Sequence, residues 1–283
     1  MDIVLANDEV VVKTFNNNIV LVNVDNTEKI LFGKGIGFGK KPGGIIEKGT
    51  VVNKVFVIEQ EENRKNLSEL IKQTDEKFFG ICEEAICEIA DEIDDEFNES
   101  IHISLIDHLY LAIKRIKNKE KVDNPFLVQI QTLYSKEFNL AEKICGIVGE
   151  KFNVIIPESE IGFVALHIHS AISNQSLSST MKNNYLGKKI VEYIEKEIGY
   201  TIDKKSLDYA RFLTHIKFAI QRILENKKNI NELNELIKVS FKESYRIAKE
   251  ASKIIEKELN VKVDEDEVAF LAIHIERLKK VEK

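Results

Sequence analysis

The chain has 283 residues, enough for two or three domains, and its 43% hydrophobic and 31% charged residues are typical of a soluble globular protein. It contains no run of about 18 consecutive apolar residues, so the sequence predicts no membrane insertion. The N-terminus lacks the basic and apolar regions of a signal peptide, and we expect a cytoplasmic protein. The net charge of −6 argues against a non-specific nucleic-acid binder, although it does not exclude a local basic site.

The N-terminal part of the chain, 1–60, predicts a small antiparallel β-domain. Short β-branched runs alternate with turn residues, among them Asn16–Asn18 and a Gly-rich stretch at 33–44. A domain of this size buries little surface and leaves sheet edges open, so we expect it to pair with a second copy in a homodimer. The four expected strands are Glu9–Phe15, Ile19–Val24, Thr27–Phe32 and Val51–Ile58.

Helical periodicity dominates the rest of the chain. Two polar segments, Glu59–Asn66 and Ser173–Thr180, are expected to be linkers. They divide the helical part into domains at 67–174 and 181–283, which follow the β-domain at 1–60. The predicted fold class is therefore multidomain, with a small all-β antiparallel N-terminal domain followed by two homologous all-α helical-bundle domains.

The two helical domains are copies of one sequence, and each copy carries two histidines. His108 opens the run H-L-Y-L-A-I-K-R-I, and His215 opens H-I-K-F-A-I-Q-R-I. His167 lies in E-I-G-F-V-A-L-H-I and His274 in E-V-A-F-L-A-I-H-I, and the offset from copy to copy is the same for both histidines. The copies therefore align without a gap, which indicates a histidine chemistry that the protein uses twice.

In each copy the second histidine is expected on a helix that starts with acidic residues. The first histidine, His108 or His215, is expected directly before a similar helix. Arg115 and Arg222 follow seven residues later on the same helix face, about 10 Å along the axis. We therefore expect these arginines to reach only a group on another helix or subunit.

Four roles are open to such histidines, and a buried structural role is the most ordinary of them. A metal site is disfavoured, because His167 and His169 form the only close pair and residues two apart on a helix point about 200° apart. The three cysteines match no zinc spacing or disulfide framework and are expected to be reduced thiols. We find no nucleophile motif, so no catalytic residue, enzymatic activity, metal or cofactor is expected. The fourth role is phosphorylation, which would add a charge of about −1.5 to −2.

The Gly-rich stretch is not a nucleotide-binding loop, because no register gives G-x-G-x-x-G or G-x-x-x-x-G-K-[ST]. Its glycines permit the close approach of a ligand, Lys34 adds positive charge and Phe38 offers a ring for base stacking. The nearby asparagines 16–18 offer amides for base edges. From the residues alone, an RNA-binding loop and a flexible turn stay open as alternatives.

The order of these parts resembles a known family. The motifs are K-T-F-N-N-N-I-V from Lys13, G-K-G-I-G-F from Gly33, D-H-L from Asp107 and E-I-G-F-V-A-L-H-I-H from Glu160. Together they resemble the BglG/LicT-type transcription antiterminators over essentially the whole chain. The β-domain is similar to the co-antiterminator (CAT) RNA-binding domain, and the repeats are similar to the regulation domains (PRDs) of the sugar phosphotransferase system (PTS). The glycine-rich run and residues 166–171 are most similar to the glucose-responsive GlcT branch.

The resemblance implies a mechanism. A CAT dimer would bind an RNA hairpin in the leader of a sugar-transport operon. This hairpin overlaps a terminator, so binding it would prevent termination. A sugar-specific enzyme II would phosphorylate the first PRD and inactivate the protein when sugar is scarce, and HPr would act mainly on the second PRD. By position, the phosphorylation candidates are His108, His167, His215 and His274. The RNA-contact candidates are Lys13, Asn18, Lys34, Gly35 and Phe38.

The chain departs from the family pattern at several positions. Many relatives have Arg in place of Lys34 and Gln in place of Gly39, which puts the hairpin preference in doubt. The second repeat has Thr214 where the first has Asp107, so the two histidine sites need not respond alike.

An alternative hypothesis is a PTS-regulated protein that binds a protein partner, and no RNA, through its β-domain. DNA readout is not expected, because residues 1–58 show no helical period from which a helix-turn-helix could form. His102 and His169 have no histidine counterpart in the second copy and receive no role.

Overall fold

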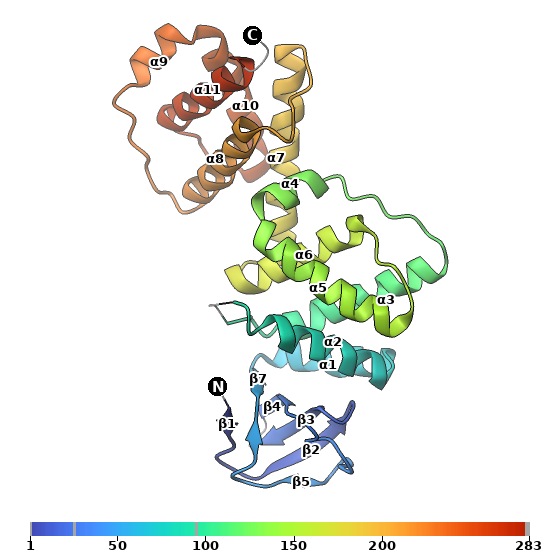
Figure 1. Cartoon of the computed structure of the whole chain (residues 1–283). Coiled ribbons are helices and arrows are strands. Elements are labelled where there is room, and N and C mark those ends of the chain that lie inside the picture. Colours follow the sequence, from blue (N-terminus) through green and yellow to red (C-terminus); the bar gives the residue numbers. More distant parts are fainter. Residues whose placement is uncertain (1, 25–26, 94–95, 281–283) are drawn as a thin grey trace. The chain divides into compact units, whose positions relative to one another are not determined.

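A computed structural model describes residues 2–24, 27–93 and 96–280 (Figure 1). The chain forms two compact units. The first contains the chain up to Asn124 together with Lys136–Ser176, and the second contains Pro125–Ser135 together with the chain from Leu177 onward. Among the residues described, none of the helices has the length and hydropathy that a membrane crossing requires.

All four strands expected from the sequence are present, with small differences at their ends. β2 stops at Thr14, one residue early, and the last expected run is divided at Asn53 into two strands. Two further strands, β1 and β5, are only two residues long, too short to show an alternating pattern. The strands are β1 (Ile3–Val4), β2 (Glu9–Thr14), β3 (Ile19–Val24), β4 (Thr27–Phe32), β5 (Ile45–Ile46), β6 (Val51–Val52) and β7 (Lys54–Ile58).

Five of these strands form an antiparallel sheet in the order β5-β2-β3-β4-β7, while β1 pairs with β6. The central strand β3 carries Val20 and Leu21, which point to opposite faces and are both buried. The sheet is therefore covered on both sides at its centre. The pairing of β2 with β3 shifts between Val11 and Lys13, and this β-bulge changes the direction of the side chains that follow.

The Gly-rich stretch after β4 folds over the turn between β2 and β3. The N–H of Gly37 donates to the carbonyl oxygen of Asn17 at 2.9 Å, and the N–H of Gly33 donates to that of Asn18 at 3.0 Å. A Cβ atom at Gly37 would lie 2.2 Å from the carbonyl oxygen of Asn16, so only glycine permits this approach. Two segments that are distant in sequence thereby form one loop cluster.

Helices follow the sheet in the first unit, and the first of them begins inside a segment expected to be a linker. α1 begins at Glu61, because acidic residues favour the first turn of a helix and Leu67 and Leu70 are buried on one of its faces. The linker prediction for Glu59–Asn66 is therefore wrong beyond its first two residues. α2 packs on α3, and α3 packs on α6. The helices are α1 (Glu61–Gln73), α2 (Glu76–Ile89), α3 (Ile101–Lys117), α5 (Ser135–Phe152) and α6 (Glu158–Ser173).

The second unit is helical, as the sequence predicts. α10 packs on α7 and on α11, and α11 packs on α8, around a hydrophobic core in which Phe212 and Ile247 are fully buried. The expected linker at Ser173–Thr180 is shorter than predicted, because α7 already begins at Leu177. The helices are α4 (Leu127–Leu133), α7 (Leu177–Ile198), α8 (Leu207–Leu224), α9 (Asn234–Ser240), α10 (Lys242–Leu259) and α11 (Glu265–Lys280).

Helix α4 comes from the sequence of the first repeat but packs in the second unit, where it contacts α7 and α8. Ile130 is fully buried there, and Nζ of Lys217 lies 4.4 Å from the ring centroid of Tyr134 at the end of α4. The compact units thus differ from the division at 67–174 and 181–283, which remains a prediction about the extent of the repeated domains.

Candidate functional site

The two histidines of the first repeat lie close together in the first unit. His108 lies within α3 and His167 on α6, and their ring centroids are 5.0 Å apart. The expectation that His108 precedes its helix is wrong, because the buried side chains of Ile101, Leu105 and Leu109 form a stripe that starts α3 earlier. The packing of α3 on α6 therefore brings together two histidines that are distant in the sequence.

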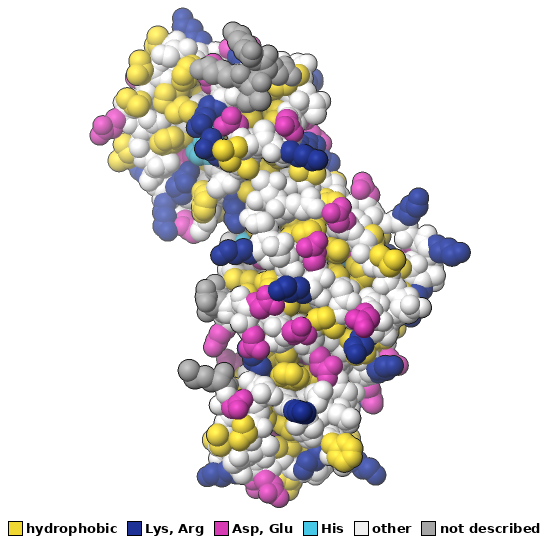
Figure 2. All heavy atoms as spheres, in the orientation of Figure 1, with side chains coloured by type: hydrophobic (Ala, Val, Ile, Leu, Met, Phe, Trp, Pro, Cys, Tyr) yellow, Lys and Arg dark blue, Asp and Glu magenta, His cyan; other side chains and the backbone are white. Residues whose placement is uncertain are grey.

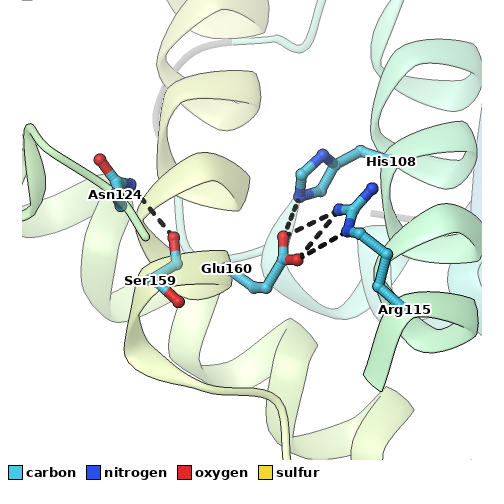
Figure 3. A network of polar contacts seen from close by, with 5 residues as sticks. All are labelled: His108, Arg115, Asn124, Ser159 and Glu160. Carbon is cyan, nitrogen blue, oxygen red and sulfur yellow. Dashed lines mark hydrogen bonds and ion pairs between the residues drawn. The ribbon is translucent and has the colours of Figure 1, made fainter. Parts of the chain in front are cut away.

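A buried carboxylate lies beside this histidine pair. Glu160, in the first turn of α6, is only 1% exposed and accepts hydrogen bonds from Nε and Nη2 of Arg115 at 3.1, 3.0 and 3.2 Å. Its Oε2 lies 3.1 Å from Nε2 of His108, and Figure 3 shows both side chains of α3 converging on the one carboxylate. Burial by itself would raise the pKa of Glu160, but the contacts with His108 and Arg115 outweigh burial and hold the pKa below its ordinary value of 4.5.

The second repeat builds the same cluster. His215 lies within α8 and His274 on α11, with ring centroids 4.6 Å apart, so the expectation that His215 precedes its helix is wrong as well. Glu267 is 5% exposed and accepts hydrogen bonds from Nε and Nη2 of Arg222 at 2.6 and 2.9 Å. Nε2 of His215 lies 3.8 Å from Oε2 of Glu267, so this glutamate holds its histidine less closely than Glu160 does.

The two glutamates have no role in the prediction from sequence, although the repeat aligns Glu160 with Glu267. The arginines are predicted there to reach only a group on another helix or subunit. Arg115 does reach another helix, α6, but its partner there also contacts His108. His108 and Arg115 therefore belong to one site. Their separation along α3 does not reveal this, because a residue of another helix joins them.

Burial controls the protonation of His167, His215 and His274. The pKa of His167 and of His215 is lowered to about 3, mainly by the loss of water and to a smaller extent by the charges of the neighbouring His108 and His274. The pKa of His274 is lowered for the same main reason. At neutral pH these buried rings are uncharged, which leaves one nitrogen of each able to accept a proton or another electrophile.

The ring nitrogens that face the glutamates are poorly accessible. The side chains of His108 and His215 are 16% and 12% exposed, and the Nε2 atom of each is buried. Histidine side chains scarcely reach the face of the molecule seen in Figure 2. Chemistry at either Nε2 atom therefore requires that the pair of helices around it opens first.

Two further histidines contact carboxylates outside these clusters. Nδ1 of His102 lies 2.8 Å from Oε2 of Glu83, and Nδ1 of His169 lies 2.7 Å from Oε1 of Glu137. The three cysteines are buried free thiols. Across residues 2–24, 27–93 and 96–280, no three His, Cys, Asp or Glu side chains are grouped so that they could hold a metal ion.

Four of the five residues expected to contact RNA lie in the loop cluster of the β-domain. Asn18 and Gly35 are in direct contact, because the N–H of Gly35 donates to Oδ1 of Asn18 at 3.1 Å. Lys34 and Phe38 lie in the same Gly-rich stretch and are exposed, Phe38 by 77%. Lys13 lies on β2 beside the cluster, where it forms an ion pair with an acidic side chain of α2.

Two family models match this chain. The CAT RNA binding domain matches residues 10–65, and the PRD domain matches residues 83–171 and 188–278. These matches cover the loop cluster and both copies of the paired histidines. The fold and the sites therefore define an RNA-binding regulator that carries two PRDs.

Individual relatives agree with this class. Protein GlcT of Staphylococcus saprophyticus subsp. saprophyticus is 34% identical over 95% of this chain and 96% of that protein. Protein GlcT of Staphylococcus haemolyticus is 32% identical over 93% of each chain. A crystal structure of GlcT CAT-PRDI, 40% identical, covers 59% of this chain and 100% of its own with a TM-score of 0.51. The chain belongs to the GlcT family of transcription antiterminators.

Membership of this family gives the function in outline. The chain is an RNA-binding antiterminator that is regulated by phosphorylation through the PTS. The family, the fold class and this function are thus confirmed as the sequence predicted them.

The buried carboxylates predict different roles for two arginines of α8. Arg222 pairs with Glu267, which is 5% exposed, whereas Arg211 pairs with Asp208 at the surface and is itself 48% exposed. We expect Arg222→Met to lower the free energy of unfolding by about 2–3 kcal/mol, because it leaves a buried charge unpaired. Arg211→Met should cost less than about 1 kcal/mol. Urea unfolding of the full chain measures both losses, and equal losses would contradict the importance of the buried pair.

The low pKa of His167 predicts a loss of stability in acid. This histidine titrates near 6.5 in the unfolded chain and at about 3 in the folded one, so its contribution is fully present above pH 6.5 and declines as the pH falls toward 3. The decline amounts to about 1.4 kcal/mol per pH unit. In an NMR titration, the Cε1–H signal that disappears in His167→Gln should keep the shift of a neutral ring down to about pH 5. A midpoint near the ordinary value would show that the ring is not buried as described.

Proposed function

We propose that the chain controls a glucose-type PTS operon by binding a leader RNA hairpin as a homodimer, and that phosphorylation of His108, His167, His215 and His274 switches this binding. The observation that carries the proposal is a histidine pair beside a buried glutamate–arginine pair, built twice at equivalent positions of the two repeats. Such a regulator acts in the cytoplasm, where the leader is transcribed. Its task requires binding and modification of the chain, and it requires no catalytic residue, metal or cofactor of its own.

A phosphoryl group on His108 is incompatible with the present contact to Glu160. Nε2 of His108 lies 3.1 Å from the carboxylate, and a phosphate adds about −1.5 to −2 charges where little water is present to screen them. Arg115 has a planar fork that pairs with phosphate as well as with carboxylate. Phosphorylation therefore gives Arg115 a competing partner and weakens the ion pair that joins α3 to α6.

The two clusters are similar enough to share a chemistry and different enough to have different donors. Asp107 precedes the first histidine of the first repeat, and Thr214 stands in its place in the second. The distance between histidine and glutamate also differs, 3.1 Å for His108 and 3.8 Å for His215. These differences support different donors for the two sites. The assignment of a sugar-specific enzyme II, which inactivates through the first PRD, and of HPr as the main donor to the second is what the resemblance to the family implies.

The loop cluster has the chemistry of a hairpin-binding face. Lys34 supplies a charge for backbone phosphates, and the exposed ring of Phe38 supplies a stacking surface for a base. The contact between Asn18 and Gly35 fixes the two segments relative to each other. Lys13 adds a second positive charge on the adjoining strand.

The β-domain also presents apolar side chains that a second copy would cover. Val10 and Val12 on β2 are 47% and 40% exposed, and Val51 on β6 is 57% exposed. Exposed apolar side chains on a small sheet with open edges favour association with another sheet. This supports a homodimer that contacts one hairpin with two copies of the loop cluster.

RNA binding is tested with the full chain and a hairpin taken from upstream of a glucose-type PTS gene of the same genome. Phe38→Ala and Lys34→Ala should each weaken binding by about tenfold or more, because a stacked base and a phosphate contact are lost. Lys48→Ala, which removes another exposed lysine of the β-domain, is the matched control and should bind like the unmodified chain. Equal binding by all three variants would show that this loop cluster is not the RNA site.

Phosphorylation is tested by incubating the chain with phosphorylated HPr and, separately, with the phosphorylated glucose-type enzyme II. Mass spectrometry under alkaline conditions, where phosphohistidine survives, should place the label on the four paired histidines. Replacing all four by Gln should remove the label, whereas His169→Gln, which changes a histidine outside the pairs, should keep it. A label that persists in the fourfold variant would refute the assignment.

A further inference from the structure

Helix α2 lies against the turn between β2 and β3, at residues that we propose to contact RNA. The side-chain amides of Asn16 and Asn18 both donate to Oε1 of Glu84, at 3.2 and 2.9 Å. The other end of the Asn18 amide, Oδ1, accepts the N–H of Gly35. Both ends of Asn18 are therefore engaged within the chain.

The fit between α2 and the turn is close. The rings of Phe15 and Phe79 stack with their centroids 4.2 Å apart, and both side chains are buried. Gly80 marks the nearest approach of the helix, because a Cβ atom there would lie 2.6 Å from the side-chain nitrogen of Asn16. A contact that depends on a glycine and on stacked rings is a built interface, distinct from a chance meeting of two surface side chains.

The groups that α2 presents have the chemistry of the groups that RNA would present. Oε1 of Glu84 accepts from Asn18, as a base carbonyl or a phosphate oxygen would accept. Glu76 pairs with Lys13 at 3.1 Å and neutralises a charge that would otherwise meet a phosphate. The same carboxylates repel an approaching RNA backbone, so the helix and the RNA cannot use these donors together.

We infer that α2 of the first PRD is an intramolecular competitor of RNA, which covers part of the hairpin-binding face until it is withdrawn. The inference rests on the proposed RNA contacts at Lys13 and Asn18. Lys34 and Phe38 lie outside the α2 contact and are exposed, so the RNA meets an open half of its site first. α2 packs on α3, the helix that carries His108. A movement of α3 at the histidine cluster would therefore act directly on α2, which covers Lys13 and Asn18.

The test compares hairpin binding by the full chain and by Glu76→Ala/Glu84→Ala, with Glu88→Ala as the control. Glu88 is an exposed carboxylate on the same helix, so its loss changes the charge of α2 without touching the turn. We expect the double variant to bind the hairpin at least about tenfold more tightly, equivalent to about 1.4 kcal/mol, and the control to be unchanged. Circular dichroism confirms that each variant is folded, and Phe38→Ala is measured beside them.

The outcomes distinguish a failure of the proposed competition from a failure of the proposed RNA face. If Phe38→Ala weakens binding and the double variant binds no more tightly than Glu88→Ala, the competition is refuted while the RNA face stands. Weaker binding by the double variant would mean that Glu84 orients Asn18 for RNA, which also overturns the inference. If Phe38→Ala has no effect, the proposed RNA face fails first. A second test uses the variant Gly80→Cys/Asn16→Cys, in which oxidation to a disulfide holds α2 against the turn. The oxidised variant should lose hairpin binding and regain it on reduction.

Discussion

A carboxylate buried between two helices is the interaction on which the histidine sites depend. Removing Glu160 from water is costly, and the fork of Arg115 with its two donors is what makes the buried charge tolerable. The same dry surroundings lower the pKa of His167, so the ring next to the ion pair stays neutral. The contact of α3 with α6 therefore combines a local balance of charge with apolar packing.

The connection between the histidines and the RNA face lies within one compact unit. α6 packs on α3, α3 packs on α2, and α2 contacts the turn that holds Asn16 and Asn18. Every step in this series is a direct contact between neighbouring elements. If these few rigid helices have two alternative arrangements, a change at the histidines is transmitted to the RNA face through direct packing contacts.

The sequence predicts much of this structure because its signals are local or repeated. β-branched runs locate four strands, and the constant offset between the repeats locates all four paired histidines together with Glu160 and Glu267. The start of α1 is not predicted, because the residues that anchor this helix, Leu67 and Leu70, lie beyond the polar segment where it begins. The bridging role of Glu160 and the contact of Glu84 with the turn depend on the approach of separate elements, which composition and periodicity do not encode.

Helix α4 belongs to the first repeat by sequence but to the second unit by packing. The chain enters the second unit at Pro125, returns to the first at Lys136 and leaves it again after Ser176. Hydrogen exchange of α4 should accordingly follow the opening of α7 and α8, although its residues stand between α3 and α5 in the sequence. The chain therefore passes between the two units three times, after Asn124, Ser135 and Ser176. A loss of order in the second unit therefore includes residues 125–135, which belong by sequence to the first repeat, with no ligand and no flexible tether required.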